Sequence, residues 1–133
     1  MRDTQTVIFE KVVCKQMNSL GKLGERYAAN YLIKHKYKLV ESNFQSRFGE
    51  IDIIAKNKSY LVFVEVKQRD ENSIATPAEF VDKSKQNKII ATAKLYLANN
   101  PTDLQPRFDV IEIYSSNNKI KSLKHLENAF TLV

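Results

Sequence analysis

The chain has 133 residues, of which 43% are hydrophobic and 27% charged, so its size and composition are those of a single folded domain. Such a composition excludes an intrinsically disordered chain and a fibrous repeat. The sequence contains no apolar run near the about 20 residues that span a bilayer, and its first residues lack the pattern of a secretion signal. We therefore expect a compact cytoplasmic protein.

The charge of the chain is positive, with 21 lysines and arginines against 15 acids, a net charge of +6 and an isoelectric point near 9.4. This excess of positive charge favours a negatively charged partner, and nucleic acid is the first candidate. The single cysteine, Cys14, cannot form an internal disulfide, which suits a reducing compartment.

The first predicted element is a helix. Residues 1–18 show no clean hydrophobic period, and we treat them as an N-terminal extension of uncertain structure, set apart from one domain over residues 19–133. From Ser19 onward, apolar residues recur at the spacing of one helix face, and this helix is expected to end near His35. The predicted apolar stripe contains Leu23, Tyr27, Ala28, Tyr31 and Leu32.

Three strands are predicted next, over residues 37–44, 50–55 and 60–67, because these runs are rich in β-branched and aromatic residues and are separated by turn-forming segments. Consecutive short connections favour antiparallel pairing of all three. The third run, residues 61–66, is apolar on both faces for most of its length. A strand of this kind is expected in the middle of a sheet that is covered on both sides.

The second half of the chain predicts one more helix and two more strands. Thr76 and Pro77 are typical of a helix start, Asp82 could cap a fresh start, and Asn99 to Pro101 end the helix. A strand over residues 107–114 and a short strand over 119–123 follow. The order helix, three strands, helix, two strands indicates an α/β fold with α-β-β-β-α-β-β order.

Side chains that suit chemistry occur on the second and third predicted strands. Because side chains alternate along a strand, Glu50, Asp52 and Ile54 share one face, and Ile51, Ile53 and Ala55 share the other. On the third strand Glu65 and Lys67 share a face.

If the two faces coincide, Asp52 and Glu65 converge on one point, with Lys67 about 7 Å further along. Two carboxylates held together need a cation or a proton, and hard oxygen ligands suit Mg²⁺ or Mn²⁺. From the spacing alone, an ordinary salt-bridge cluster with Lys67 or Arg69 explains the same residues equally well. Glu25 lies at the edge of the first helix's apolar stripe, where it either joins this metal or is a solvated surface residue.

Four motifs occur in order along the chain: GKLGE over residues 21–25, GEIDII over 49–54, VFVEVKQR over 62–69 and RFDVI over 107–111. Together they resemble the YraN-like family of bacterial proteins, which are regarded as predicted endonucleases. That family is similar to archaeal Holliday junction resolvases and to the wider restriction-endonuclease-like superfamily.

The resemblance implies a restriction-endonuclease-like fold, in which helices flank a mixed central sheet, and a Mg²⁺- or Mn²⁺-dependent endonuclease that cleaves DNA. It places the catalytic and metal-binding acids at Asp52, Glu65 and Glu25, and the catalytic lysine at Lys67. Supporting contacts are expected from Glu50 and Gln68.

Basic residues that flank the expected site are candidates for contact with DNA phosphates, although each one is equally well explained as a solvated surface residue. They are Arg47, Arg69, Lys83, Lys85 and Lys88. No base-reading motif is apparent, so recognition of branched or nicked DNA by shape is what the resemblance implies. A homodimer would also suit a resolvase-like protein.

Two other functions remain open at this point. One is a non-catalytic nucleic-acid-binding module of the same fold, and the other is a protein-interaction domain. The histidines, His35 and His125, have no partner acid or thiol at a catalytic spacing in the sequence, and we do not expect chemistry from them.

Overall fold

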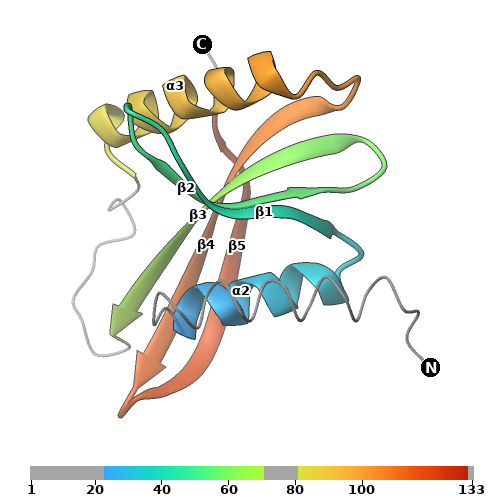
Figure 1. The fold of residues 1–133 in the computed structure, drawn as a ribbon. Coiled ribbons are helices and arrows are strands. Elements are labelled where there is room, and N and C mark those ends of the chain that lie inside the picture. The colour runs from blue at the N-terminus through green and yellow to red at the C-terminus, as the bar shows by residue number, and fades with distance from the viewer. Residues whose placement is uncertain (1–22, 71–80, 132–133) are drawn as a thin grey trace.

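The computed structural model describes residues 23–70 and 81–131, which form a five-stranded mixed sheet with two helices (Figure 1). The elements follow the predicted order. They are α2 (Leu23–Lys34), β1 (Lys38–Gln45), β2 (Glu50–Lys56), β3 (Tyr60–Asp70), α3 (Lys83–Asn99), β4 (Gln105–Ser116) and β5 (Lys119–Phe130). This arrangement confirms the α/β class that the sequence predicts and agrees with a restriction-endonuclease-like domain.

The strands lie side by side in chain order, and β3 is the central one. As predicted, β1, β2 and β3 pair in antiparallel fashion. β3 and β4 are parallel along their whole length, and β4 pairs antiparallel with β5. The parallel pair requires a crossover connection, and α3 supplies its helix.

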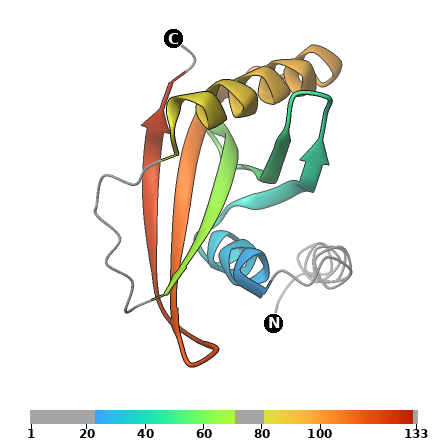
Figure 2. The same cartoon turned by 90° about the vertical axis from the view of Figure 1, so that its left-hand side faces the viewer.

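The two helices cover opposite faces of the sheet (Figure 2). Ala28, Ala29 and Leu32 of α2 pack into one buried cluster with Val62 and Val64 of β3. On the other face, α3 packs against alternate residues of the same strand. The α3 cluster includes Leu61, Phe63, Ile89, Ile90, Ala93 and Tyr96. The central position of β3 therefore matches its two apolar faces.

Helix α2 buries Ala28 and Leu32 of the predicted stripe, but the buried stripe is shifted toward Ala29 and away from Leu23 and Tyr27. Leu23 and Tyr27 are 54% and 44% exposed, while Ala28, Ala29 and Leu32 are fully buried. Small alanine side chains permit a closer approach of the helix to the sheet than tyrosine would allow.

The helix ends at a left-handed residue. The Lys36 backbone has φ 71, and the Tyr37 amide donates to the Leu32 carbonyl at 3.0 Å. This is the bonding of a Schellman cap, with lysine at the position usually taken by glycine.

Strand β2 separates from β3 at its N-terminal end. Backbone pairing of the two strands runs only over Ile53–Lys56 of β2. Beyond it the Val66 amide donates to the Asp52 carboxylate, at 2.8 Å, so a side chain occupies the place of a ladder partner. In this unpaired part of β2, Ile51 packs in the α3 cluster together with Ile54. The prediction that Ile51 faces the opposite side from Ile54 is therefore wrong.

The start of α3 is set by Asp82, whose carboxylate accepts from the Lys85 amide at 2.8 Å. The fresh start that the sequence allowed at Asp82 is thus the start of the helix, and the proposed cap at Thr76 lies outside the described residues. The predicted end at Asn99 is confirmed. The last strand, predicted to be short, in fact has 12 residues.

Within the part of the chain that the structure describes, no helix has the length and apolar character needed to cross a membrane.

Candidate metal site

A polar cavity of about 600 Å³ lies where β2 parts from β3, beside the N-terminal turn of α3. Residues from α2, β2, β3 and α3 all contribute to its wall. The residues that line it are Glu25, Gly49, Glu50, Asp52, Glu65, Val66, Asp82, Ser84, Lys85, Lys88 and Ile89. Acids from three elements thus face bases from a fourth.

Three carboxylates converge in this cavity. Glu25, Glu50 and Asp52 each offer an oxygen, and these oxygens lie within 4.8 Å of one another. Glu25 is 5% exposed and Asp52 is 8% exposed, so water screens their repulsion poorly. Three hard oxygen donors with concentrated negative charge are the ligand set of a divalent cation such as Mg²⁺. The residues present therefore fit a metal ion.

Asn43 of β1 supports two of these acids. With its amide nitrogen turned toward the cavity, it donates to Glu50 Oε1 at 3.1 Å and to Glu25 Oε2 at 3.2 Å. Its backbone is left-handed, with φ 53, a conformation that asparagine tolerates better than most residues. Asn43 was not among the predicted site residues, and an asparagine inside a strand-like run is the only sequence signal that points to it.

Asp52 carries the strongest electrostatic perturbation of the site. Burial, followed by the nearby charges of Glu65, Glu25 and Glu50, raises its pKa from 3.8 to about 8, although the hydrogen bond from the Val66 amide opposes this rise. At neutral pH the cavity without a cation therefore retains a proton at Asp52. A bound cation would replace that proton, because it supplies the positive charge that the cluster lacks.

Glu65 is held by a base instead of joining the cluster of three. Its Oε1 lies 2.6 Å from the Lys85 Nζ, and its side chain is 6% exposed while that of Lys85 is 51% exposed. The hydrogen bond to Glu65 raises the pKa of Lys85, against the effect of partial burial, so the lysine stays charged. The sequence predicts a phosphate contact for Lys85 and carries no signal for this ion pair with Glu65.

The other residues predicted from the third strand lie in three different environments. Lys67 is partly buried and, by strand alternation, lies on the same side of the sheet as Glu65, but it is not among the described residues that line the cavity. Gln68 faces α2, where its side chain lies against Gly24. Arg69 forms an ion pair with Glu112 at 2.7 Å, so it belongs to a salt bridge on β3 and β4.

Four of the predicted phosphate contacts are exposed near the cavity. Lys83, Lys85 and Lys88 lie on the first two turns of α3, and Arg47 lies in the β1–β2 turn with its guanidinium 4.8 Å from the centre of the Phe48 ring.

The β1–β2 turn is fastened to α3 by buried Thr92. Its hydroxyl is 2.9 Å from the Ser46 hydroxyl and donates to the Lys88 carbonyl, also at 2.9 Å. Gly49 permits close contact here, because a side chain in its place would meet Lys88 Cβ at 3.3 Å.

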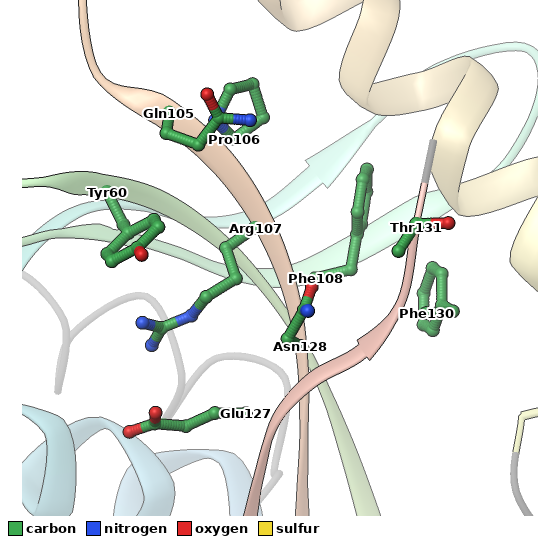
Figure 3. Close-up of a pocket in the computed structure, with 9 residues that line it drawn as sticks. All are labelled: Tyr60, Gln105, Pro106, Arg107, Phe108, Glu127, Asn128, Phe130 and Thr131. Carbon is green, nitrogen blue, oxygen red and sulfur yellow. The ribbon is translucent and has the colours of Figure 1, made fainter. Parts of the chain in front are cut away.

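A second cavity, of about 560 Å³, lies near Tyr60 of β3, about 16 Å along the strand from Glu65 (Figure 3). Arg107 dominates its wall, with its guanidinium 4.7 Å from the centre of the Tyr60 ring. That guanidinium is also bonded to Asp109 through two nitrogens and to the Tyr37 hydroxyl. The arginine is thus engaged in the fold, and nothing in this cavity resembles the acid cluster.

His125 also bonds to Asp109, at 2.7 Å, although the two residues are 16 positions apart in the sequence. The opposite ring nitrogen of His125 lies 3.1 Å from the Tyr31 hydroxyl of α2. Burial disfavours the charge on Asp109, but the hydrogen bonds from His125 and Arg107 hold its pKa below the ordinary value. This network ties β5 and α2 to the buried end of β4.

Comparison with known proteins agrees with the motif resemblance. The profile of the uncharacterised protein family UPF0102 matches residues 24–113. A UPF0102 protein of Caldanaerobacter subterraneus subsp. tengcongensis is 45% identical over 115 residues, which cover 84% of this chain and 94% of the relative. A UPF0102 protein of Clostridioides difficile is 42% identical over 111 residues, covering 83% and 95%. One from Clostridium acetobutylicum is 45% identical over 114 residues, covering 84% and 93%. The chain therefore belongs to the UPF0102 family, which confirms the YraN-like resemblance of its motifs.

Proposed function

We propose that this protein is a Mg²⁺- or Mn²⁺-dependent endonuclease that hydrolyses phosphodiester bonds of DNA. The observation that carries the proposal is the convergence of Glu25, Glu50 and Asp52 within 4.8 Å, on a cavity whose other wall holds Lys85 and Lys88. The carboxylates suit a hard divalent cation, and the ammonium groups suit a phosphate. A site that holds both at one place can bind a phosphodiester and activate it for hydrolysis.

A bound divalent ion supplies polarisation of a phosphate oxygen and acidifies a water molecule. Asp52 contributes a rigid ligand, because the Val66 amide fixes its carboxylate at 2.8 Å. Glu65 adds a further buried carboxylate beside the cluster. We assign to Lys67, two residues along the same strand face, the stabilisation of charge on the phosphate during attack.

The exposed bases near the cavity give the substrate class. Arg47, Lys83 and Lys88 lie on the turn and helix that border it and would contact phosphates without reading base sequence. The resemblance to junction resolvases makes branched and nicked DNA the substrates to test first.

The test is cleavage of labelled linear, nicked, flapped and four-way-junction DNA in Mg²⁺, Mn²⁺ or EDTA. We expect metal-dependent cleavage by the wild-type protein and its loss in Asp52→Asn and Lys67→Met. Asp103→Asn is the matched control, since it makes the same chemical change at an exposed position outside the cavity. Cleavage that survives Asp52→Asn would come from another site or from a contaminant. Binding of DNA without cleavage in every condition would overturn the enzyme and favour the non-catalytic nucleic-acid-binding module.

A further inference from the structure

The ion pair of Lys85 with Glu65 has a property that a simple structural salt bridge lacks. Its acid is fixed on the central strand and almost fully buried, whereas its base is half exposed in the first turn of α3. If another positive charge reaches Glu65, the carboxylate must stay and the flexible lysine can leave. The lysine is therefore the exchangeable partner.

The place of the incoming charge is also fixed by the structure. Among the described residues, the mutually close carboxylates are Glu25, Glu50 and Asp52, and Glu65 contacts Lys85 instead. All four acids line one cavity. A divalent cation in the cluster would offer Glu65 a stronger partner than a single ammonium, because the attraction scales with the charge.

The lysine that is set free remains on the wall of the same cavity. Ser84 and Lys88, next to it on the first two turns of α3, also line this wall. An ammonium without its carboxylate partner attracts the nearest anion, which in a nuclease is a phosphate of the bound strand.

We propose that Lys85 is an exchangeable counter-ion: it neutralises Glu65 until a divalent cation binds, and then transfers to a phosphate of the DNA, so that metal and DNA bind cooperatively. This inference rests on the proposed function of the cavity. By linkage, each ligand raises the affinity of the other by the same factor, and we expect a factor of about ten. The free protein is then held in a state with lower affinity for both ligands.

The test measures binding instead of turnover. DNA affinity is measured by fluorescence anisotropy with a fluorescein-labelled duplex that carries uncleavable phosphorothioate linkages, with and without Mg²⁺. Mg²⁺ affinity is measured by calorimetry, with and without the same duplex. We expect Lys85→Met to bind Mg²⁺ alone more tightly than wild type, because no ammonium competes for Glu65. We expect the coupling between the two ligands to fall at least threefold in this variant.

Lys88→Met is the matched control, because it removes a lysine that lines the same wall but does not form the ion pair with Glu65, which belongs to Lys85. It should weaken DNA binding equally with and without Mg²⁺ and leave the coupling unchanged.

A double-mutant cycle that combines Glu65→Gln with Lys85→Met tests directly whether Lys85 moves from Glu65 to the DNA. This isosteric change frees Lys85 without any metal, so it should raise the metal-free DNA affinity about tenfold, toward the Mg²⁺-bound value. The gain should vanish in a Lys85→Met background, whereas simple removal of one negative charge would raise affinity in both backgrounds. A coupling equal to wild type in Lys85→Met, or an equal gain from Glu65→Gln in both backgrounds, would overturn the inference. Neither result touches the proposed nuclease, which fails only if the cavity binds no metal or no DNA is cleaved.

Discussion

Replacing Asp52 by asparagine should stabilise the metal-free protein at alkaline pH. In the folded state burial and the neighbouring carboxylates raise the pKa of Asp52 from 3.8 to about 8. Between these two values the folded protein binds a proton that the unfolded chain has lost, so the free energy of unfolding falls as the pH rises. The loss is complete above about pH 8, where Asp52 must ionise inside the cavity.

The size of the effect follows from the same values. A rise from 3.8 to about 8 sets a ceiling of about 6 kcal/mol for a group that titrates alone. Burying the asparagine amide in place of the acid costs about 1 to 3 kcal/mol. The ceiling is also lowered because the neighbouring carboxylates titrate together with Asp52, so part of the destabilisation at high pH belongs to them and remains in the variant. We therefore expect Asp52→Asn to raise the free energy of unfolding by about 2 to 4 kcal/mol at about pH 9. The asparagine side chain keeps an oxygen that can accept from the Val66 amide.

The assay is urea unfolding followed by circular dichroism, in EDTA, across the pH range. Wild type and Asp52→Asn should agree within about 1 kcal/mol near pH 5, where the buried aspartic acid is neutral, and should diverge as the pH rises. The other titratable groups are present in both proteins, so their contributions to the pH dependence of the free energy of unfolding largely cancel in this comparison. Added Mg²⁺ should stabilise the wild type at alkaline pH and stabilise the variant much less. A variant that is less stable than wild type at about pH 9 would refute the electrostatic reasoning.

Three further changes test the network and the surface around the site. Asp109→Asn should cost about 3 to 5 kcal/mol at neutral pH, because it leaves the buried Arg107 charge without its partner. Since the Asp109 pKa is lowered, this difference should shrink as the pH falls below about 4 in urea titrations. Thr92→Val should cost about 1 to 3 kcal/mol, because the buried hydroxyl bonds both Ser46 and α3, and a double-mutant cycle with Ser46→Ala measures the shared part. Arg47→Ala should weaken DNA binding uniformly across sequences and lower the slope of log affinity against log salt by about 1.

Each of these changes has a control in the same fold. Asp103→Asn, on an exposed loop, should leave stability within about 0.5 kcal/mol of wild type at every pH. Lys121→Ala, exposed on β5 at the opposite edge of the sheet from β1, should not alter the salt slope as Arg47→Ala does. Additive energies for Thr92→Val and Ser46→Ala would show that their contact contributes nothing to stability.

Local patterns determined most of the elements and their order. The apolar run of β3 has two buried faces because it is central, and alternation alone placed Glu65 and Lys67 on one side. Turn residues marked the ends of the strands, and Asp82 was one of two possible caps for α3, since these signals act over a few residues of chain. The acids at Asp52 and Glu65, and Glu25 near the start of α2, could be named from the motifs for the same reason.

Only the tertiary structure decided how those side chains meet. β2 diverges from β3 beyond Ile53, where Ile51 packs in the α3 cluster and the Asp52 side chain, in place of a backbone partner, accepts from the Val66 amide across the two strands. The full length of β5 depends on its pairing with β4, because its own sequence is largely polar.

Two pairs of single side chains also could not be predicted from the sequence. The pairing of Lys85 with Glu65, and that of His125 with Asp109, joins residues 20 and 16 positions apart in the sequence. The hydrophobic period and the turn residues are local properties of the sequence, so they determine where helices and strands form. Charge partners are chosen by distances in the folded chain, and those distances are set when the elements pack.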